Sequence, residues 1–256
     1  MGDNRVQALD RAIDILEELS RQPDGLGVTG LGSVLGLHKS TVHRLLNTLM
    51  HRGYVEKNIS NDKYRLGLKV IELGQSRLEN IEIRKEARPF LKNLMKLTNE
   101  TVHLSMMDNG EIVYIDKVES LNTVRMCSRV GLRAPVHCTA MGKAVVAFWP
   151  DEKVRKIIKE KGLVRKTNNT ITDYEKLLVE FDLIRKNGYA VDNEENDPGI
   201  RCVAAPVRNY SGEVIASISV SGPSSRITKE RIDELASKAM DTALNISRQL
   251  GYRGNI

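Results

Sequence analysis

The stretch "HKSTVHRLLNTLMHRGYV", residues 38–55, has the pattern of a single helix with two different faces. Val42, Leu45, Leu46 and Leu49 follow the i, i+3, i+4, i+7 spacing, which places them on one stripe of a helix. The other positions are mostly hydrogen-bond donors or cations: Lys39, Ser40, Thr41, His43, Arg44, Asn47 and His51. We therefore expect this helix to pack by its leucines and to offer its polar face to a partner.

The neighbouring segments predict how this helix is held. Apolar residues spaced along positions 6–19 indicate a first amphipathic helix, and residues 29–35 indicate a short second one that ends at Gly36. Glycines at positions 30 and 32 are expected to weaken the second helix, because glycine is a poor helix former. "GYVEK" and "KYRLG" then read as two strands around a turn at residues 58–62. Three helices followed by a basic hairpin predict a winged helix-turn-helix domain over residues 1–67.

The winged helix-turn-helix arrangement predicts double-stranded DNA as the partner, with separate roles for the polar residues. Ser40 and Thr41 lie near the helix N-terminus, where hydroxyl groups and the helix dipole favour phosphate. The side chains expected to reach base edges are Lys39, His43, Arg44 and Asn47. Those expected to hold backbone phosphates are Lys57, Lys63 and Arg65. A helix hairpin that docks to another protein is the alternative, but such faces usually carry apolar anchors, and this face has none.

Charge is concentrated in the same region. The chain has 256 residues and a formal net charge of +6, and residues 38–69 contain seven Lys or Arg against two acidic residues. A solvated surface would explain a charge run alone, but its coincidence with the amphipathic helix favours a nucleic-acid partner.

The remainder of the chain predicts a linker and a second domain. Leu68, Ile71, Leu78 and Ile81 indicate a linker helix over residues 68–82, and a longer helix follows, bent by Pro89 or carrying it in its first turn. Residues 83–256 then alternate between strands and helices, which predicts an α+β domain with a mostly antiparallel sheet. The expected strands are 101–108, 111–119, 123–129, 188–192, 200–208 and 213–221, and the expected helices are 140–148, 151–160, 173–186 and 228–249.

Small residues on two of these strands predict a polar cavity. In "IASISVSG", Ser217, Ser219 and Ser221 share one face of the strand, because side chains alternate with period two. Small residues (Cys202, Ala204 and Pro206) follow the neighbouring strand in the same way. Thr139 is placed to cap a helix whose first N–H groups, near Ala140 and Met141, would attract an anion. With Asp192 as an acceptor for hydroxyl groups, this site suits a small hydroxy or keto acid.

Cysteine content and hydropathy predict a protein of the reducing cytoplasm. The chain has three cysteines and no CxxC pair, which argues against a disulfide framework and a zinc ribbon. The N-terminal residues lack the apolar core of a signal peptide. No apolar run approaches the roughly 20 residues that span a bilayer, so no membrane association is expected.

Several motifs in the same order resemble the IclR family of bacterial transcriptional regulators. They are "ALDRAIDILEEL", "LGLHKSTVHRLLNTLMHRGYVEK", "YRLGLKVIELG", "APVHCTAMGKA", "GYAVDNEENDPGIRCVAAPV" and "ASISVSGPSSRIT", and together they span essentially the whole chain. The resemblance implies a winged helix-turn-helix domain, a linker helix, and a C-terminal effector-binding domain of GAF-like topology. It also implies a regulator, expected to be a repressor, that binds a pseudo-palindromic operator as a homodimer or a dimer of dimers.

The resemblance further implies an effector site for a small anionic metabolite, such as a sugar-derived keto or hydroxy acid. The matching positions are Met126, Ala140, Met141, Asp192, Ile200, Cys202, Ser219 and Ser221. One departure concerns the second helix, "VTGLGSVLG", where the family usually has a polar, alanine-rich segment. Its glycines put the stability of this helix, and a phosphate contact from Thr29, in question.

Two other classes of function were weighed. A cysteine-dependent enzyme would need Cys202, His137 and Asp192 to converge as nucleophile, base and orienting group, but the chain has no nucleophile elbow or known thiol-enzyme motif. A metal site would need a group drawn from His103, His137, Cys138, Cys202 and Asp192 to gather. No ligand spacing demands such a site, so we expect no enzyme activity, no metal and no cofactor.

Overall fold

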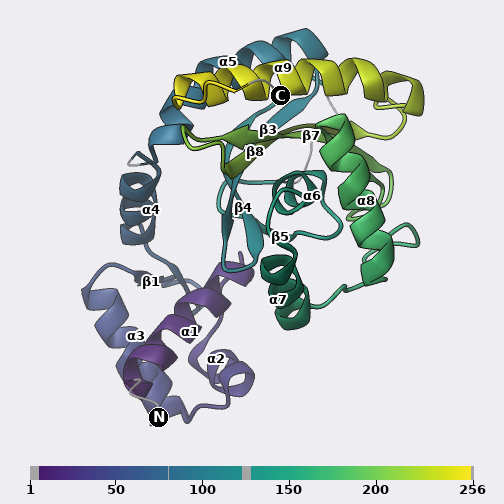
Figure 1. Cartoon of the computed structure of the whole chain (residues 1–256). Helices are drawn as coiled ribbons and strands as arrows, with labels where there is room; N and C mark the ends of the chain where they lie inside the picture. The colour runs from purple at the N-terminus through teal and green to yellow at the C-terminus, as the bar shows by residue number, and fades with distance from the viewer. Residues whose placement is uncertain (1–5, 80, 123–127, 255–256) are drawn as a thin grey trace. The chain divides into compact units, whose positions relative to one another are not determined.

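A computed structural model describes residues 6–79, 81–122 and 128–254, and it divides the chain into two compact units, Met1–Asn80 and Ile81–Ile256 (Figure 1). Each unit has its own hydrophobic core. The two units are described separately below.

The first unit consists of three helices and a two-stranded sheet. Their bounds are α1 Gln7–Arg21, α2 Val28–Leu35, α3 Lys39–His51, β1 Val55–Lys57 and β2 Tyr64–Leu66. The leucine-rich stripe of α3 faces inward as predicted: Val42, Leu46 and Leu49 are buried in a core with residues from α1, α2 and the hairpin. The order of elements and this packing confirm the winged helix-turn-helix arrangement.

Helix α2 forms despite its glycines, and one of them has a packing role. A Cβ atom on Gly32 would lie 2.8 Å from the carbonyl oxygen of Leu37, so the backbone between α2 and α3 approaches too closely for a larger residue. Gly36 follows in the left-handed conformation and closes the helix by donating its N–H to Gly32. Gly32 therefore has a packing role that its helix propensity does not reveal, because this position requires the missing side chain.

Helices α4 (Lys69–Glu79) and α5 (Glu82–Thr98) follow the hairpin. Helix α4 contains no buried residue, and it exposes Ile71 and Leu73, with Leu68 exposed just before it. Ile81 is the N-cap of α5 and is buried in the second unit, although the sequence pattern places it in the linker. Pro89 lies inside α5 and not in its first turn.

The second unit is built on a six-stranded antiparallel sheet with strand order β5-β4-β3-β8-β7-β6. The strands are β3 Thr101–Asp108, β4 Glu111–Val118, β5 Arg133–Pro135, β6 Ala190–Asn193, β7 Ile200–Arg208 and β8 Val214–Pro223. Strand β5 has no counterpart among the sequence predictions. Of the predicted strand 123–129, residues 123–127 lie outside the described residues.

Helices cover this sheet. The bounds of the remaining helices are α6 Ala140–Val146, α7 Asp151–Lys161, α8 Tyr174–Asn187, the short 3-10 turn η1 Lys229–Arg231 and α9 Ile232–Gln249. Helices α5 and α9 run side by side above the sheet in Figure 1, and α6 lies below it against β7 and β8.

Strand register explains where the polar side chains gather. Asp192, Cys202 and Ser221 are successive partners across β6, β7 and β8, and Ala204, Ser219 and His103 form the next row across β7, β8 and β3. The hydroxyl of Ser217 donates to the carbonyl of Met141 in α6, which shows that the serine face of β8 looks toward α6. The small residues predicted from the alternation therefore lie on one face of two adjacent strands, β7 and β8.

Candidate functional site

The polar face of α3 is open to solvent. Lys39, Ser40, His43, Arg44 and Asn47 are exposed, whereas Val42 and Leu46 between them are buried and Leu45 is partly buried. Thr41, on the same helix, is half-buried. The side chains of Asn47 and His43 lie 3.3 Å apart, one helical turn from each other, and form a hydrogen-bonded pair on this face. The helix thus presents a group of donors that the rest of the first unit leaves uncovered.

The hairpin formed by β1 and β2 holds its cations in ion pairs. Lys57 Nζ lies 2.6 Å from Asp62, and Arg65 Nε lies 2.6 Å from Glu56 on the opposite strand. These ion pairs are exposed, so water and salt screen them. Replacing their acidic partners by phosphate therefore costs little free energy. Lys63 stands between the two pairs, and its backbone N–H donates to Asn61. Thr29 is exposed in the first turn of α2.

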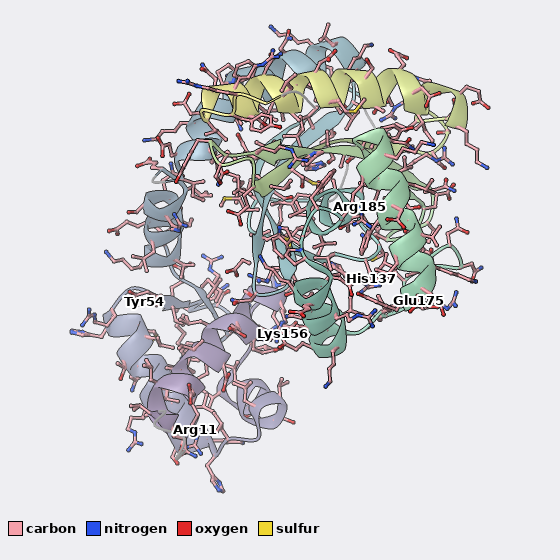
Figure 2. All side chains as sticks on the ribbon, viewed as in Figure 1. Arg11, Tyr54, His137, Lys156, Glu175 and Arg185 are labelled. Carbon is pink, nitrogen blue, oxygen red and sulfur yellow. The ribbon has the colours of Figure 1, made fainter. Side chains whose placement is uncertain are left out.

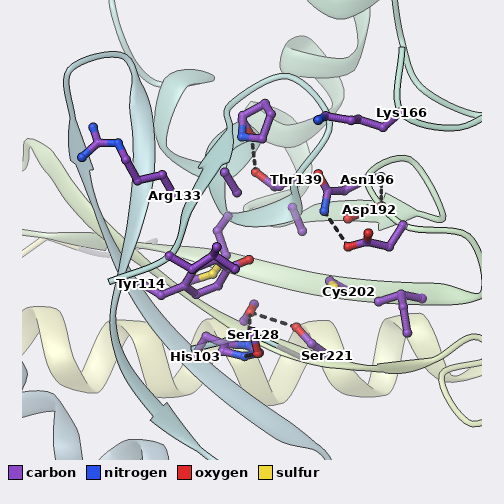
Figure 3. A pocket seen from close by; sticks show the side chains of 18 residues that line it. His103, Tyr114, Ser128, Arg133, Thr139, Lys166, Asp192, Asn196, Cys202 and Ser221 are labelled. Atoms are coloured by element: carbon purple, nitrogen blue, oxygen red, sulfur yellow. Dashed lines mark hydrogen bonds between the residues drawn. The ribbon is translucent and has the colours of Figure 1, made fainter. Parts of the chain in front are cut away.

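The second unit contains a cavity of about 500 Å³ against the serine face of the sheet (Figure 3). Seven of the eight residues expected to bind an effector line it: Ala140, Met141, Asp192, Ile200, Cys202, Ser219 and Ser221. The eighth, Met126, lies outside the described residues. The structure thus brings together residues from α6, β6, β7 and β8 that are up to 81 positions apart in the chain. Ligand binding by these residues stays a prediction.

One wall of the cavity is acidic. Asp192 is buried, and its Oδ1 accepts the backbone N–H groups of Glu195 at 2.7 Å and Asn196 at 3.4 Å. Burial raises the pKa of Asp192 to about 7, although these two N–H groups favour its charged form. The loop after β6 also contributes Asn196 and Asp197 to the lining.

A buried lysine forms ion pairs that anchor the loop of the acidic wall. Lys143 of α6 is fully buried, and its Nζ lies 2.6 Å from Glu195 and 2.9 Å from Glu180 of α8. The carbonyl oxygen of Glu195 also accepts the hydroxyl of Thr170 at 2.6 Å. The loop that supplies the acidic wall is therefore anchored to α6, α8 and the segment before α8.

Two cations, Arg133 and Lys166, also line the cavity. Figure 3 shows Arg133 and Lys166 away from His103, Ser128 and Ser221, which lie together. Arg133 is engaged by Asp108 at 2.8 Å and Glu111 at 3.1 Å. Lys166 is exposed and adds a positive charge to the lining of the cavity. Thr139, which also lines it, caps α6 by accepting the N–H of Gly142.

The structure does not assemble the alternative catalytic group. Cys202 and Asp192 are neighbours, but the Nε2 of His137 lies 3.0 Å from the carbonyl oxygen of Val164, and His137 lines a separate, smaller cavity. Burial also raises the pKa of the Cys202 thiol far above its usual value, so the thiol is protonated and a poor nucleophile. Within the described ranges, no group of three or more His, Cys, Asp or Glu side chains is arranged to hold a metal ion.

Several lining residues were not foreseen from the sequence. They are His103, Tyr114, Ser128, Leu132, Arg133, Ala134, Lys166, Asn196 and Asp197. His103 lies two residues before Ser105 and therefore on the same face of β3, which is a signal that the sequence offers. Its position in the cavity, however, depends on the pairing of β3 with β8. Asn196 and Asp197 follow Asp192 closely in the chain, and proximity to that residue was their only signal.

The comparisons with known proteins cover both units. A family model described as "Bacterial transcriptional regulator IclR C-terminal" matches residues 75–248, and one described as "IclR helix-turn-helix domain" matches residues 8–58. The HTH-type transcriptional regulator XynR of Escherichia coli strain K12 is 37% identical over 247 residues, which cover 96% of this chain and 98% of XynR. The HTH-type transcriptional repressor AllR of the same strain is 35% identical over 249 residues, covering 97% of this chain and 92% of AllR.

A solved structure agrees with these matches. The crystal structure of the Thermotoga maritima IclR has a TM-score of 0.80 and 37% sequence identity, and the alignment covers 97% of this chain and all of that one. No helix in the part of the chain that the structure describes is long and apolar enough to cross a membrane.

Proposed function

The chain belongs to the IclR family of transcriptional regulators, and we propose from this premise that α3 reads one operator while a small carboxylic acid in the cavity alters that binding. The observation that carries the proposal is the pairing of two features in one chain. One is an exposed face of donors and cations on a helix with a buried apolar stripe, and the other is a cavity of about 500 Å³ with several polar side chains in its lining.

The DNA contacts follow from the geometry of α3 and the hairpin. Arg44 and Asn47 are long or planar enough to pair with guanine and adenine edges in a major groove. Lys63 on the hairpin would contact backbone phosphate, as Lys57 and Arg65 would after giving up their acidic partners.

Exposed apolar residues support a homodimer. Helix α4 is 11 residues long and has no buried residue, and isolated helices of this length are marginal in water. Leu68 and Ile71 are 74% and 67% exposed, so a second copy that covered them would stabilise the helix. Two copies related by a twofold axis would present two recognition helices, which matches a pseudo-palindromic operator.

The cavity supports a small hydroxy or keto acid as the effector. The first N–H groups of a helix have no partner within it, and those of α6 stand at Ala140 and Met141 on the cavity wall, near Lys166. A ligand carboxylate at this end would leave a ligand hydroxyl to donate to Asp192, and a hydroxyl or keto oxygen to meet the hydroxyls of Ser219 and Ser221. The repressor role is supported by AllR, whose name describes it as a repressor.

Replacing Arg44 by Ala should weaken binding to the cognate operator by about 1–3 kcal/mol and relax the preference at one base pair, because a base-edge contact is lost. Lys63→Ala is the matched control: it should weaken binding to all sequences alike and reduce the salt slope by about one. Fluorescence anisotropy over a series of salt concentrations measures both. Wild-type affinity and salt dependence in both variants would contradict the DNA-binding surface.

A thermal-shift screen of small 2-keto and 2-hydroxy acids should reveal compounds that raise the melting temperature with concentration, since a ligand that binds only the folded state stabilises it. Asp192→Ala should lose this shift yet bind operator like the wild type when no ligand is present. Asp241→Ala, which changes an exposed aspartate on α9, should keep the shift. An unchanged shift in Asp192→Ala would remove Asp192 from the ligand site.

A further inference from the structure

A continuous chain of hydrogen bonds crosses the floor of the cavity. Ser128 Oγ lies 2.7 Å from Nε2 of His103, His103 Nδ1 lies 3.4 Å from Ser219 Oγ, and Ser219 Oγ lies 3.1 Å from Ser221 Oγ. All four side chains line the cavity, and Figure 3 shows His103, Ser128 and Ser221 close together. We refer to these four residues as the His103 relay.

The imidazole in the middle of the relay is neutral. His103 is only 2% exposed, and burial lowers its pKa to about 3, with a smaller contribution from the charge of Lys117. Its ring packs edge-on against Tyr114, with the ring centroids 5.1 Å apart. A neutral imidazole has one donor nitrogen and one acceptor nitrogen, and the proton can reside on either.

Each tautomer gives the relay a direction. When Nε2 carries the proton, it donates to Ser128, Nδ1 accepts the hydroxyl of Ser219, and Ser219 accepts the hydroxyl of Ser221 or a donor from the cavity. When Nδ1 carries the proton, it donates to Ser219, which donates to Ser221, and the hydroxyl of Ser221 is then free to donate. The change of tautomer thus converts Ser221 from an acceptor to a donor without moving any heavy atom.

We propose that the His103 relay makes the cavity accept either a carbonyl or a hydroxyl oxygen at Ser221, so that a 2-keto acid and its 2-hydroxy counterpart both bind. His103 is then the residue that sets this tolerance. The inference rests on the proposed function for the location and the chemical class of the ligand; the reversal of the relay is a property of the protein alone.

The contacts around Ser221 are compatible with this reversal. The hydroxyl of Ser221 hydrogen-bonds the Cys202 thiol, and sulfur is a weak acceptor that a ligand carbonyl would replace. A second serine pair on the same face is separate: Ser105 and Ser217 lie 3.0 Å apart, and Ser217 donates to the carbonyl of Met141. Ser217 is therefore a matched control, since it shares the strand and the face but not the relay.

Nitrogen-15 NMR of histidine-labelled protein tests the relay without a ligand. The chain has five histidines, so the His103 signals are assigned by their loss in His103→Gln. The wild type should give intermediate shifts for both ring nitrogens, as two tautomers in exchange do. Ser219→Ala should move the ratio toward one tautomer, because Nδ1 loses its partner, and Ser217→Ala should leave it unchanged. A single fixed tautomer in the wild type that Ser219→Ala does not shift would overturn the relay.

Pyruvate and L-lactate, titrated into the same sample, test the ligand class. The two dissociation constants should agree within about threefold, and pyruvate, whose carbonyl oxygen can only accept, should drive His103 toward the tautomer with the proton on Nδ1. A difference of about tenfold or more between the two dissociation constants would mean that Ser221 has one fixed hydrogen-bonding role, and would overturn the proposed tolerance. If neither acid binds, the ligand class assigned to the cavity is wrong, whereas the tautomer measurement still decides the relay.

Discussion

Lys143→Met should lower the free energy of unfolding of the second unit by about 3–5 kcal/mol, the range expected when one partner of a buried ion pair is removed. Methionine matches the length of lysine but carries no charge, so the carboxylate of Glu195 would lose its cation while buried at 6% exposure. Glu180 is 26% exposed at its side chain and can turn to water, so Glu195 bears most of the loss. Its Oε2 already has no hydrogen-bond partner in the described structure.

Two variants separate the charge effect from a packing effect. Lys143→Met combined with Glu195→Gln should recover most of the lost stability, because the amide removes the unpaired charge and keeps an acceptor for the N–H of Asn193. Lys156→Met changes an exposed lysine on α7, labelled in Figure 2, and should stay within about 0.5 kcal/mol of the wild type.

Urea unfolding followed by the fluorescence of Trp149, the single tryptophan of the chain, reports on the second unit alone. A loss below about 1 kcal/mol in Lys143→Met, or a double variant no more stable than the single one, would show that the ion pair does not hold the loop.

Local sequence patterns were enough to predict most of the helices and strands, but not all of their contacts. The leucine stripe of α3, the serine alternation of β8 and the Asn109–Gly110 turn between β3 and β4 each depend on residues within about ten positions. Period and turn chemistry act at this range, so these elements were predictable. The short strand β5 was missed because three residues, "RAP", carry no periodicity.

The lining of the cavity includes residues that local sequence patterns do not predict. Ser219 and Ser221 were found because their face is small and polar, yet His103 and Tyr114 reach the cavity only through the pairing of β3 with β8 and β4. Lys143 illustrates the opposite limit: a lysine in a helix usually reaches water, and only the folded structure reveals that Glu180 and Glu195 converge on it. The packing role of Gly32 was not predicted, because helix propensity ignores the close approach of Leu37.

Asp192→Asn should stabilise the second unit, and the gain should depend on pH. Burial raises the pKa of Asp192 from 3.8 to about 7 in the folded state, so the protonated carboxyl contributes stability that is fully present below pH 4 and is lost as the pH rises through 7. Asparagine cannot ionise, and its Oδ1 can still accept the N–H groups of Glu195 and Asn196. The gain should therefore be near zero at pH 4 and on the order of 4 kcal/mol at pH 8.

The same residue is expected to be required by the ligand, so stability and function oppose each other at this position. A buried carboxylate at neutral pH weakens the fold, and we attribute its presence to the hydroxyl groups that an ionised acceptor can bind. Urea unfolding at pH 4 and pH 8, again followed by Trp149, measures the effect, with Asp241→Asn on the exposed face of α9 as the control. An equal change in stability at the two pH values would mean that Asp192 ionises in the folded protein without cost, and that the acidic wall is charged whether or not a ligand is bound.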